Sequence, residues 1–174
     1  MSYRFYAKTG IITGLIIFAV FAAGVFIKQF NEKRAIKTMD AVILRVVDGD
    51  TVVLAGGQKV RLLGIDAPET KHPDRPVEKG GIEAKNYLKK RIEGKKCVLE
   101  YTIYDQFDVY DRLLALIYAA DGGLVNAEEV KKGYAYASPN KYMSRTKEFL
   151  VLENIAKKFK KGIWETEEGG EVKK

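Results

Sequence analysis

Cysteine and histidine are almost absent from this sequence, which excludes some kinds of structural and catalytic site. Its single cysteine, Cys97, cannot form a disulfide within the chain. Because Cys97 lies in an apolar, strand-like run, we expect a buried thiol and not a nucleophile. The single histidine, His72, lies in a Lys-His-Pro loop, where we expect a surface position and not a catalytic base. The sequence also lacks internal repeats and long low-complexity segments, so we expect one domain of ordinary size.

A strong excess of charge is also missing from most of the chain. The whole sequence has 30 Lys and Arg residues against 23 Asp and Glu residues, with a pI of about 9.3. Residues 40–174 hold 24 basic and 22 acidic residues, a net charge of 24 − 22 = +2. Most of the basic surplus therefore lies near the N-terminus. The pI by itself is weak support for a nucleic-acid partner.

One long charge-free run is present, and it lies near the N-terminus. Residues 1–9 form a basic flank, and residues 11–27 contain no charged residue. A helix over this run would be about 25 Å long, close to the ~30 Å hydrocarbon core of a membrane. We therefore predict a transmembrane anchor over residues 10–28, followed by a linker over residues 29–39.

Two other interpretations of this run are open, and its orientation is ambiguous. A cleaved signal peptide fits the small residues Ala22, Ala23 and Gly24 near a possible cleavage site. A buried core helix fits less well, because no face of the run is polar. Arg4 and Lys8 favour an N-terminus on the inner side, whereas the basic residues that follow the run favour the opposite orientation.

Residues 40–165 alternate between strand-like and helix-like patterns. The strand-like runs are rich in Val, Ile and Leu and are separated by turn residues. Five ranges are predicted as strands: 41–47, 51–55, 58–65, 97–104 and 113–119. Three segments are predicted as helices: 84–92, 127–132 with Asn126 as its cap, and a last helix between Ser144 and Gly162.

These elements favour an α+β fold for the domain over residues 40–165. Five strands with about three helices suit a small OB-type β-barrel that carries its helices on the outside. The predicted transmembrane helix precedes this barrel. Residues 166–174 follow it as a charged, glycine-containing tail.

Acidic groups concentrate around an arginine just after the first predicted strand. Asp48 lies in an Asp-Gly-Asp turn, Arg61 and Asp66 flank an apolar run, and Glu69 follows in Asp-Ala-Pro-Glu. Carboxylates gathered near one arginine are costly unless a cation or an anionic substrate balances the charges. Calcium prefers oxygen ligands, and an arginine can bind phosphate bidentately. The alternative interpretation is a solvated turn beside an ordinary surface strand.

The order of the motifs along the chain favours the functional interpretation. The sequence contains D-G-D-T and R-L-L-G-I-D-A-P-E-T, then K-H-P, V-E-K and G-x-E-A, then D-x-Y-x-R, V-N and G-I-W-E. With these motifs in this order, the chain resembles the staphylococcal nuclease (thermonuclease) family over about residues 40–165. The resemblance implies an OB-type barrel and calcium-dependent hydrolysis of phosphodiester bonds in nucleic acid.

The resemblance also implies a metal site and a general base. Asp48 and Asp66 are implied as ligands of Ca²⁺, with the backbone carbonyl of Ala67 as a third ligand. The family often has threonine where this chain has Ala67, a change that a carbonyl ligand survives. Glu69 matches the carboxylate proposed as the general base or as the group that orients the attacking water.

Two arginines and two tyrosines complete the implied site. Arg61 and Arg112 match the pair that clamps the phosphate, and Tyr110 matches a tyrosine that contacts phosphate. Tyr136 is a candidate for stacking on a base of the substrate. For Arg112 the alternative is a surface ion pair with a neighbouring aspartate such as Asp108, which would contribute little stability.

Taken together, the sequence predicts a membrane-anchored, calcium-dependent endonuclease of the thermonuclease type that acts on DNA and/or RNA. The resemblance implies attack by water, release of a 5′ hydroxyl and a 3′ phosphate product. We expect a monomer whose nuclease domain is extracytoplasmic, or a secreted form if the N-terminal segment is cleaved. The competing prediction is a non-catalytic OB-fold module that binds nucleic acid at the membrane. Arg61, Glu69 and Arg112 are all present, which argues against that module.

Overall fold

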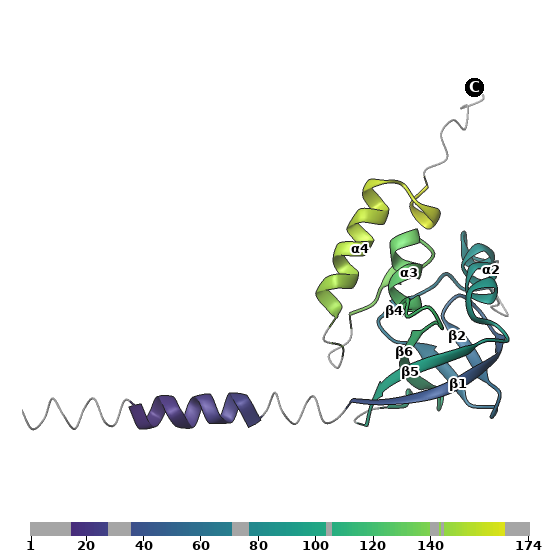
Figure 1. Cartoon of the computed structure of the whole chain (residues 1–174). Helices are drawn as coiled ribbons and strands as arrows, with labels where there is room; N and C mark the ends of the chain where they lie inside the picture. The colour runs from purple at the N-terminus through teal and green to yellow at the C-terminus, as the bar shows by residue number, and fades with distance from the viewer. Residues whose placement is uncertain are drawn as a thin grey trace, which may run out of the picture. The chain divides into compact units, whose positions relative to one another are not determined.

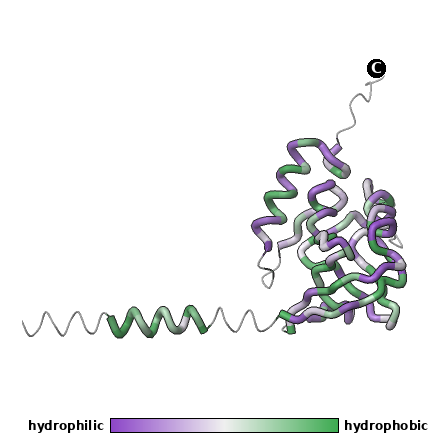
Figure 2. Tube along the Cα trace, in the orientation of Figure 1, coloured by the Kyte–Doolittle hydropathy of each residue, from purple (hydrophilic) through white to green (hydrophobic). Residues whose placement is uncertain are grey.

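The computed structural model describes residues 15–27, 36–70, 77–103, 106–139, 143 and 145–165. The chain divides into two compact units, Met1–Ile36 and Lys37–Lys174. In the first unit, residues 15–27 form a helix with exposed and mostly hydrophobic residues (Figure 2). Among the described residues, no helix is both long and apolar enough to cross a membrane. The predicted anchor over residues 10–28 and the tail over residues 166–174 extend outside the described ranges, so both stay predictions.

The second unit is built on a closed five-stranded barrel (Figure 1), which confirms the predicted α+β barrel. Around the barrel the strands are β1 (Ile36–Val46), β2 (Thr51–Leu54), β3 (Lys59–Leu62), β6 (Leu113–Tyr118) and β5 (Lys96–Thr102). The pairs β1–β2, β2–β3 and β5–β6 are antiparallel, whereas β3 and β6 are parallel. The barrel thus joins the N-terminal hairpins to a strand that lies some fifty residues later in the sequence.

The third predicted strand, over residues 58–65, is wrong in its extent because the chain turns at Gly64. Gly64 has a φ of +81°, a value that L side chains rarely adopt and that ends β3 at Leu62. The chain continues as the short strand β4 (Ile65–Asp66), which pairs with β7 (Tyr136–Ala137) in a two-stranded ladder. The turn therefore separates Asp66 from the barrel strand that carries Arg61.

The strand register decides which side chains face the outside of the barrel. Val52 and Val60 are partners on β2 and β3, and both are fully buried in the barrel core. Val53 pairs with Arg45 on β1 and with Lys59 on β3. Because successive residues of a strand point to opposite faces, Arg45, Val53 and Lys59 form a row on the outer face. Arg45 and Lys59 are exposed at the two ends of this row.

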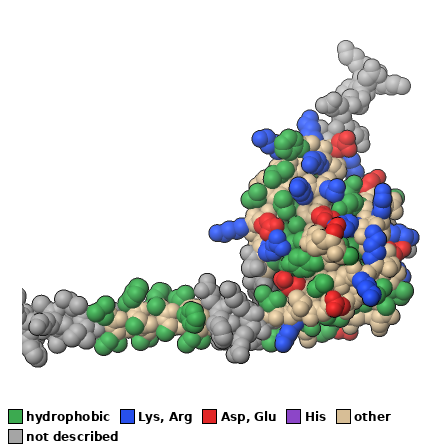
Figure 3. Space-filling model, viewed as in Figure 1, with side chains coloured by type: hydrophobic (Ala, Val, Ile, Leu, Met, Phe, Trp, Pro, Cys, Tyr) green, Lys and Arg blue, Asp and Glu red, His purple; other side chains and the backbone are tan. Residues whose placement is uncertain are grey.

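Three α-helices of the described second unit cover the barrel, as predicted. They are α2 (Gly81–Ile92), α3 (Val125–Lys132) and α4 (Thr146–Lys158), followed by the short 3₁₀ helix η1 (Gly162–Trp164). In Figure 1 the helices lie on the same side of the strands, and α3 packs against both α2 and α4. Each buries an apolar stripe: Ala84, Leu88 and Ile92 of α2, Val125 and Val130 of α3, Phe149 and Ala156 of α4. Lys and Arg side chains mix with Asp and Glu on the face shown in Figure 3, as the low net charge predicts.

Asn126 does not cap α3, which corrects the sequence prediction. The helix begins two residues earlier, at Val125, with Leu124 at the N-cap position and no side-chain cap. The Asn126 side chain is instead fully buried, and its Nδ2 donates to the carbonyls of Leu63 (2.9 Å) and Ala115 (3.2 Å). Its Oδ1 accepts from the backbone N–H of Ile117 at 2.9 Å. Asn126 thus joins α3, β6 and the turn after β3. Ser144, the predicted start of the last helix, lies outside the described residues.

Candidate active site

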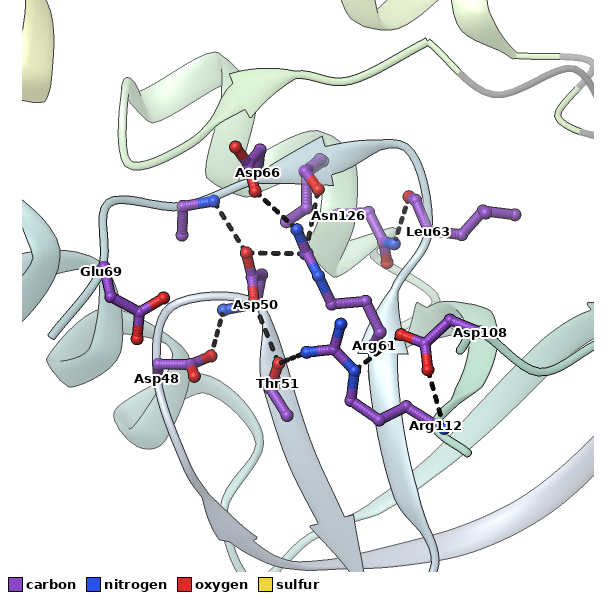
Figure 4. Close-up of polar contacts among 12 residues, drawn as sticks. Asp48, Asp50, Thr51, Arg61, Leu63, Asp66, Glu69, Asp108, Arg112 and Asn126 are labelled. Atoms are coloured by element: carbon purple, nitrogen blue, oxygen red, sulfur yellow. Dashed lines mark hydrogen bonds and ion pairs between the residues drawn. The ribbon is translucent and has the colours of Figure 1, made fainter. Parts of the chain in front are cut away.

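Arg61 lies at the centre of the polar cluster above the β1–β2 turn (Figure 4). Its guanidinium forms ion pairs with Asp50 and with Asp66, each with an N···O distance of 2.6 Å. Its Nη1 also donates to the carbonyl of Ile65 at 3.0 Å. The Arg61 side chain is 16% exposed, so it is mostly buried but still partly accessible to solvent. One arginine on β3 thus bridges a carboxylate from the β1–β2 turn and a carboxylate from β4.

Asp50 is the site residue that the sequence analysis missed. Its side chain is 9% exposed, and its Oδ2 accepts from the backbone N–H of Ala67 at 2.8 Å. Its Oδ1 accepts from the Thr51 hydroxyl at 3.0 Å. Burial raises the pKa of Asp50 to about 7; Arg61 lowers this pKa and Asp48 raises it. The available signal was the second Asp of the Asp-Gly-Asp turn, which stands directly before the strand β2.

Asp48, the predicted metal ligand, lies in the same turn but has a different partner. Its Oδ1 accepts from the backbone N–H of Asp50 at 3.2 Å, a contact that closes the turn. Among the described residues, Arg61 forms its ion pairs with Asp50 and Asp66 and not with Asp48. Asp50 and Asp66 are therefore the two carboxylates that one guanidinium brings together. Gly49 between the two aspartates has no room for a side chain, because a Cβ there would lie 2.6 Å from the Cβ of Ala67.

Arg112, the second predicted arginine, is held beside the first by a tight turn. Its Nε donates to Asp108 Oδ2 at 2.7 Å, which is the ion pair named as the structural alternative. Its Nη1 also reaches the Thr51 hydroxyl at 3.3 Å, next to Asp50. Burial raises the pKa of Asp108, but hydrogen bonds from Arg112 and from the N–H of Tyr110 outweigh it and hold this pKa below its ordinary value. Arg112 is thus fixed by a charged partner and still directed toward the site.

The two arginines share one surface depression. A cavity of about 260 Å³ is lined by both guanidinium-bearing residues and by Asp108 and Ser138. Fixed arginines on a common cavity can donate several hydrogen bonds to one phosphate. The structure therefore places Arg61 and Arg112 on one cavity, and the phosphate clamp that the resemblance implies stays a prediction.

The remaining predicted site residues lie around this depression. Glu69 is exposed, and its carboxylate has no partner among the described residues, while its N–H donates to Glu78. In the view of Figure 4 the carboxylates of Asp48 and Glu69 both point toward the space beside Asp50. The Tyr110 ring is 74% exposed and lies 5.3 Å from the Arg112 guanidinium carbon.

Tyr136 lies next to the site through the backbone pairing of β4 with β7. It is the β7 partner of Asp66 and is 40% exposed. Its ring meets the Trp164 ring edge-on, with a centroid distance of 5.2 Å. A partly exposed aromatic ring is therefore present beside Asp66, and its role in stacking on a base stays a prediction.

The oxygen atoms at this site are of the type that calcium prefers, but the protein supplies few of them. Asp50 and Asp66 supply carboxylate oxygens, the donors that calcium prefers, and the buried Asp50 carboxylate already depends on a positive charge nearby. Within the described ranges no group of three or more His, Cys, Asp or Glu side chains could hold a metal ion. A calcium ion at this place would therefore complete its coordination with backbone carbonyl, water and substrate oxygens.

Comparisons with known proteins agree with this geometry. The family model described as staphylococcal nuclease homologue matches residues 59–166. The chain is 35% identical over 129 residues to the thermonuclease of Staphylococcus hyicus, covering 70% of this chain and 73% of that protein. It is 30% identical over 168 residues to the thermonuclease of Staphylococcus intermedius, covering 89% and 98%. It is 35% identical over 142 residues to the endonuclease YncB of Bacillus subtilis, covering 77% and 65%.

Proposed function

Because this chain belongs to the staphylococcal nuclease family and is a nuclease that hydrolyses phosphodiester bonds, we propose that it is a calcium-dependent, membrane-anchored endonuclease of nucleic acid. The observation that carries the proposal is the Arg61 guanidinium, which bridges Asp50 and Asp66 at the edge of a cavity shared with Arg112.

The arginines bind the scissile phosphate and stabilise its transition state. As water attacks, negative charge grows on the phosphate oxygens, and donors already fixed in place stabilise that charge without reorganising. Arg61 is fixed by Asp50 and Asp66, and Arg112 by Asp108. Both therefore meet the substrate in one orientation, and each presents a planar set of donors.

The metal is proposed to bind at Asp50 and Asp66, with the carbonyl of Ala67 as a further ligand. When bound, the calcium ion supplies Lewis-acid stabilisation of charge on the phosphate oxygens. Asp50 replaces Asp48 in this proposal, because the Asp50 carboxylate lies between Ala67 and the guanidinium that also holds Asp66. Asp48 keeps the turn closed through the N–H of Asp50.

Glu69 is proposed to act on the attacking water. Its exposed carboxylate has no partner among the described residues, so it is available to accept a proton or to orient a water molecule. Attack opposite the 5′ oxygen releases a 5′ hydroxyl and leaves a 3′ phosphate. The neighbouring Tyr110 and Tyr136 rings are proposed to contact the substrate on either side.

The metal assignment is tested with Asp50→Asn and its matched control Asp48→Asn. The full-length chain in mild detergent is assayed for cleavage of single-stranded DNA, duplex DNA and RNA while calcium is titrated after chelation. We expect chelation to abolish cleavage and calcium to restore it. Asp50→Asn should raise the calcium needed for half-maximal activity by at least about 10-fold, and Asp48→Asn should raise it less. Full activity in chelator, or the larger effect at Asp48, contradicts this assignment.

The non-catalytic binding module is the second candidate, and the same assay decides it. A module of that kind binds single-stranded nucleic acid through exposed aromatic rings, and Tyr110 at 74% exposed offers one. It predicts binding without calcium-dependent cleavage in the wild type. Calcium-dependent cleavage that Asp50→Asn reduces excludes it.

Membrane anchoring is supported by the apolar helix over residues 15–27 and by the charge-free run of residues 11–27. We expect the full-length protein to stay in the membrane fraction after carbonate washing, with residue 1 retained and the nuclease domain on the extracytoplasmic side. Recovery of a soluble protein that begins near Val25 would instead identify the run as a cleaved signal peptide.

A further inference from the structure

Exposed apolar side chains gather on two neighbouring strands of the barrel, β1 and β5. Met39, Val42 and Leu44 of β1 and Val98 of β5 are 36–56% exposed, and Ile103, directly after β5, is 46% exposed. β1 and β5 are neighbours in the closed barrel, and Figure 1 shows them side by side. We call these five residues the apolar face. Exposed large hydrophobic side chains that lie together mark a surface that another molecule covers.

The other strands of the barrel do not expose apolar side chains in this way. All four residues of β2 are buried, and the apolar residues of β3, Val60 and Leu62, are buried as well. Four of the six residues of β6 are buried, and none of the six is exposed. The apolar face is therefore a property of β1 and β5 and not of the barrel as a whole.

A β-bulge directs Leu44 toward the outside of the barrel. The pairing of β1 with β2 shifts between Ile43 and Arg45, which leaves Leu44 as an extra residue on β1. Ile43 is fully buried, whereas Leu44 and Arg45 are both exposed. A bulge changes the direction of side chains at a fixed place in a strand. The exposure of Leu44 is thus set by the strand pairing and not by a loop.

The covalent chain keeps this face near the apolar N-terminal segment. The helix over residues 15–27 exposes large hydrophobic side chains, and the second unit begins at Lys37. The nine residues between them, 28–36, span at most about 35 Å even when fully extended. A membrane that holds the helix is therefore within reach of β1, the first strand after this stretch.

The charge of this part of the chain suits a surface of anionic lipid. Residues 28–45 contain five basic and two acidic residues, a net charge of 5 − 2 = +3. Basic residues beside a membrane are attracted to anionic headgroups. A second copy of this chain on the same face would instead bring two sets of positive charge together, which is unfavourable. Lipid is therefore a better occupant of the apolar face than a second copy.

Contact with lipid at this face would leave the candidate active site uncovered. The cavity shared by Arg61 and Arg112 is lined by residues of β3, β4, β6 and nearby turns, and none of the five apolar residues is on its lining. The lining of the larger cavity that contains Arg45 and Tyr110 also includes none of them. The apolar face is thus separate from the surface at which nucleic acid is proposed to bind.

We propose that the apolar face lies against the lipid surface that holds the N-terminal segment, with its side chains among the headgroups. Its partner is a bilayer that contains anionic lipid. This contact holds the nuclease unit in one orientation on the membrane, whereas a linker alone would leave it free to rotate. The proposal rests on the membrane anchoring proposed above.

Quenching by brominated lipids tests this contact in the full-length protein. Trp164 is the single tryptophan, so Trp164→Phe removes the native signal, and Leu44→Trp or the control Val151→Trp on α4 then supplies one reporter. Leu44 and Val151 are 56% and 57% exposed, so the two reporters differ mainly in their place on the surface. Each variant is reconstituted into vesicles of phosphatidylcholine and phosphatidylglycerol. We expect brominated acyl chains to reduce the emission of the Leu44→Trp variant at least about 2-fold and to leave that of the Val151→Trp variant nearly unchanged, because a docked apolar surface reaches the acyl boundary.

A second pair of variants tests whether the apolar side chains hold the contact. The reporter is now Met39→Trp, again with Trp164→Phe. Adding Leu44→Ser/Val98→Ser should reduce the quenching by about half or more, because it removes apolar groups that lipid would cover. The matched control Leu150→Ser/Val151→Ser on α4 changes residues of nearly the same exposure, 39% and 57%, and should leave the quenching unchanged. Thermal unfolding in mild detergent checks that every variant is folded.

The outcomes separate this proposal from the anchoring on which it rests. If carbonate washing removes the wild-type protein from the vesicles, the anchoring fails and the docking fails with it. If the protein stays and brominated lipids quench neither reporter, or quench both equally, the anchoring stands and the docking is wrong. If the emission of the Leu44→Trp variant shifts to shorter wavelength without quenching, another copy of the chain covers the face, which also overturns the contact with lipid.

Discussion

Arg61 and Arg112 are each fixed by a carboxylate, and both line one cavity. Replacing either by lysine keeps the charge but removes the planar fork. We expect single-turnover cleavage to fall about 10²–10³-fold, the loss typical of one transition-state donor. Arg145→Lys, which alters an ion pair with Glu148 on α4, is the matched control and should keep the wild-type rate. Wild-type rates in both site variants would contradict the phosphate clamp.

Glu129 is a buried acid without a hydrogen-bond partner. Glu129 is fully buried on α3, and neither of its carboxyl oxygens has a hydrogen-bond partner among the described residues. Burial raises the pKa of Glu129 to about 9, with further increases from Asp50 and Glu128 and a decrease from Lys132. The folded chain therefore holds a proton that the unfolded chain releases near the ordinary pKa of 4.5. Stability should then decrease as the pH rises from about 4.5 to 9.

The Glu129→Leu variant tests how much the buried carboxyl group lowers the stability of the protein at high pH. Leucine fills the site without a carboxyl group, so stability at pH 8 should increase and its decline between pH 5 and pH 9 should become shallower. Denaturant unfolding at several pH values measures both effects. Glu83→Gln on the exposed first turn of α2 is the control and should leave the pH dependence as in wild type. If the Glu129→Leu variant is less stable than wild type at pH 8, Glu129 has an unseen stabilising partner.

For single residues, the sequence predicted which residues belong to the site better than it predicted their hydrogen-bond and ion-pair partners. Arg61 pairs with Asp66 and lines one cavity with Arg112, and short motifs place these residues on neighbouring strands and turns. Their roles in catalysis stay predictions. Asp50 was missed because two aspartates in one turn look equivalent in a sequence. Only the strand that begins at Thr51 directs Asp50 inward, toward the guanidinium.

Among the elements, α3 is tied to the site through Asn126. Asn126→Ala would leave the Leu63 carbonyl, the Ala115 carbonyl and the Ile117 N–H without this partner. A buried polar group without a partner costs about 1–3 kcal/mol. We therefore expect a loss of at least about 2 kcal/mol in the free energy of unfolding, measured with denaturant at neutral pH. The exposed Asn86→Ala on α2 is the control and should change it by less than about 0.5 kcal/mol.

The same elements show where sequence patterns stop being informative. The Leu-Leu-Gly-Ile run is apolar throughout, so it predicts one strand, whereas Gly64 turns the chain there. The turn is held by distant residues: the Leu63 N–H donates to Ala115, and the Ser138 N–H donates to Gly64. Contacts of this kind join parts of the sequence that no local periodicity connects. For that reason the barrel strands were predicted and the β4–β7 ladder was not.

The whole molecule consists of two units that separate near residue 36. The second unit contains the barrel, the helices α2, α3 and α4, and all residues of the proposed site. We therefore expect a chain that begins at Ile36 to keep the melting temperature of the full-length protein within about 2 °C. It should also keep the rate of cleavage in solution, measured in the same detergent. A large loss of either would show that the N-terminal segment stabilises the nuclease unit.

The parallel pairing of β3 with β6 also decides when the protein can become active during its synthesis. Arg61 leaves the ribosome early, but Arg112 and its strand follow some fifty residues later, and Asn126 fixes the turn after β3 later still. A nascent chain that ends before these residues has one half of a phosphate clamp and no closed barrel. We therefore expect the chain to be inactive as a nuclease while most of it is being translated, when its own messenger RNA lies nearby. We expect its activity to begin only as the last third of the chain emerges and folds.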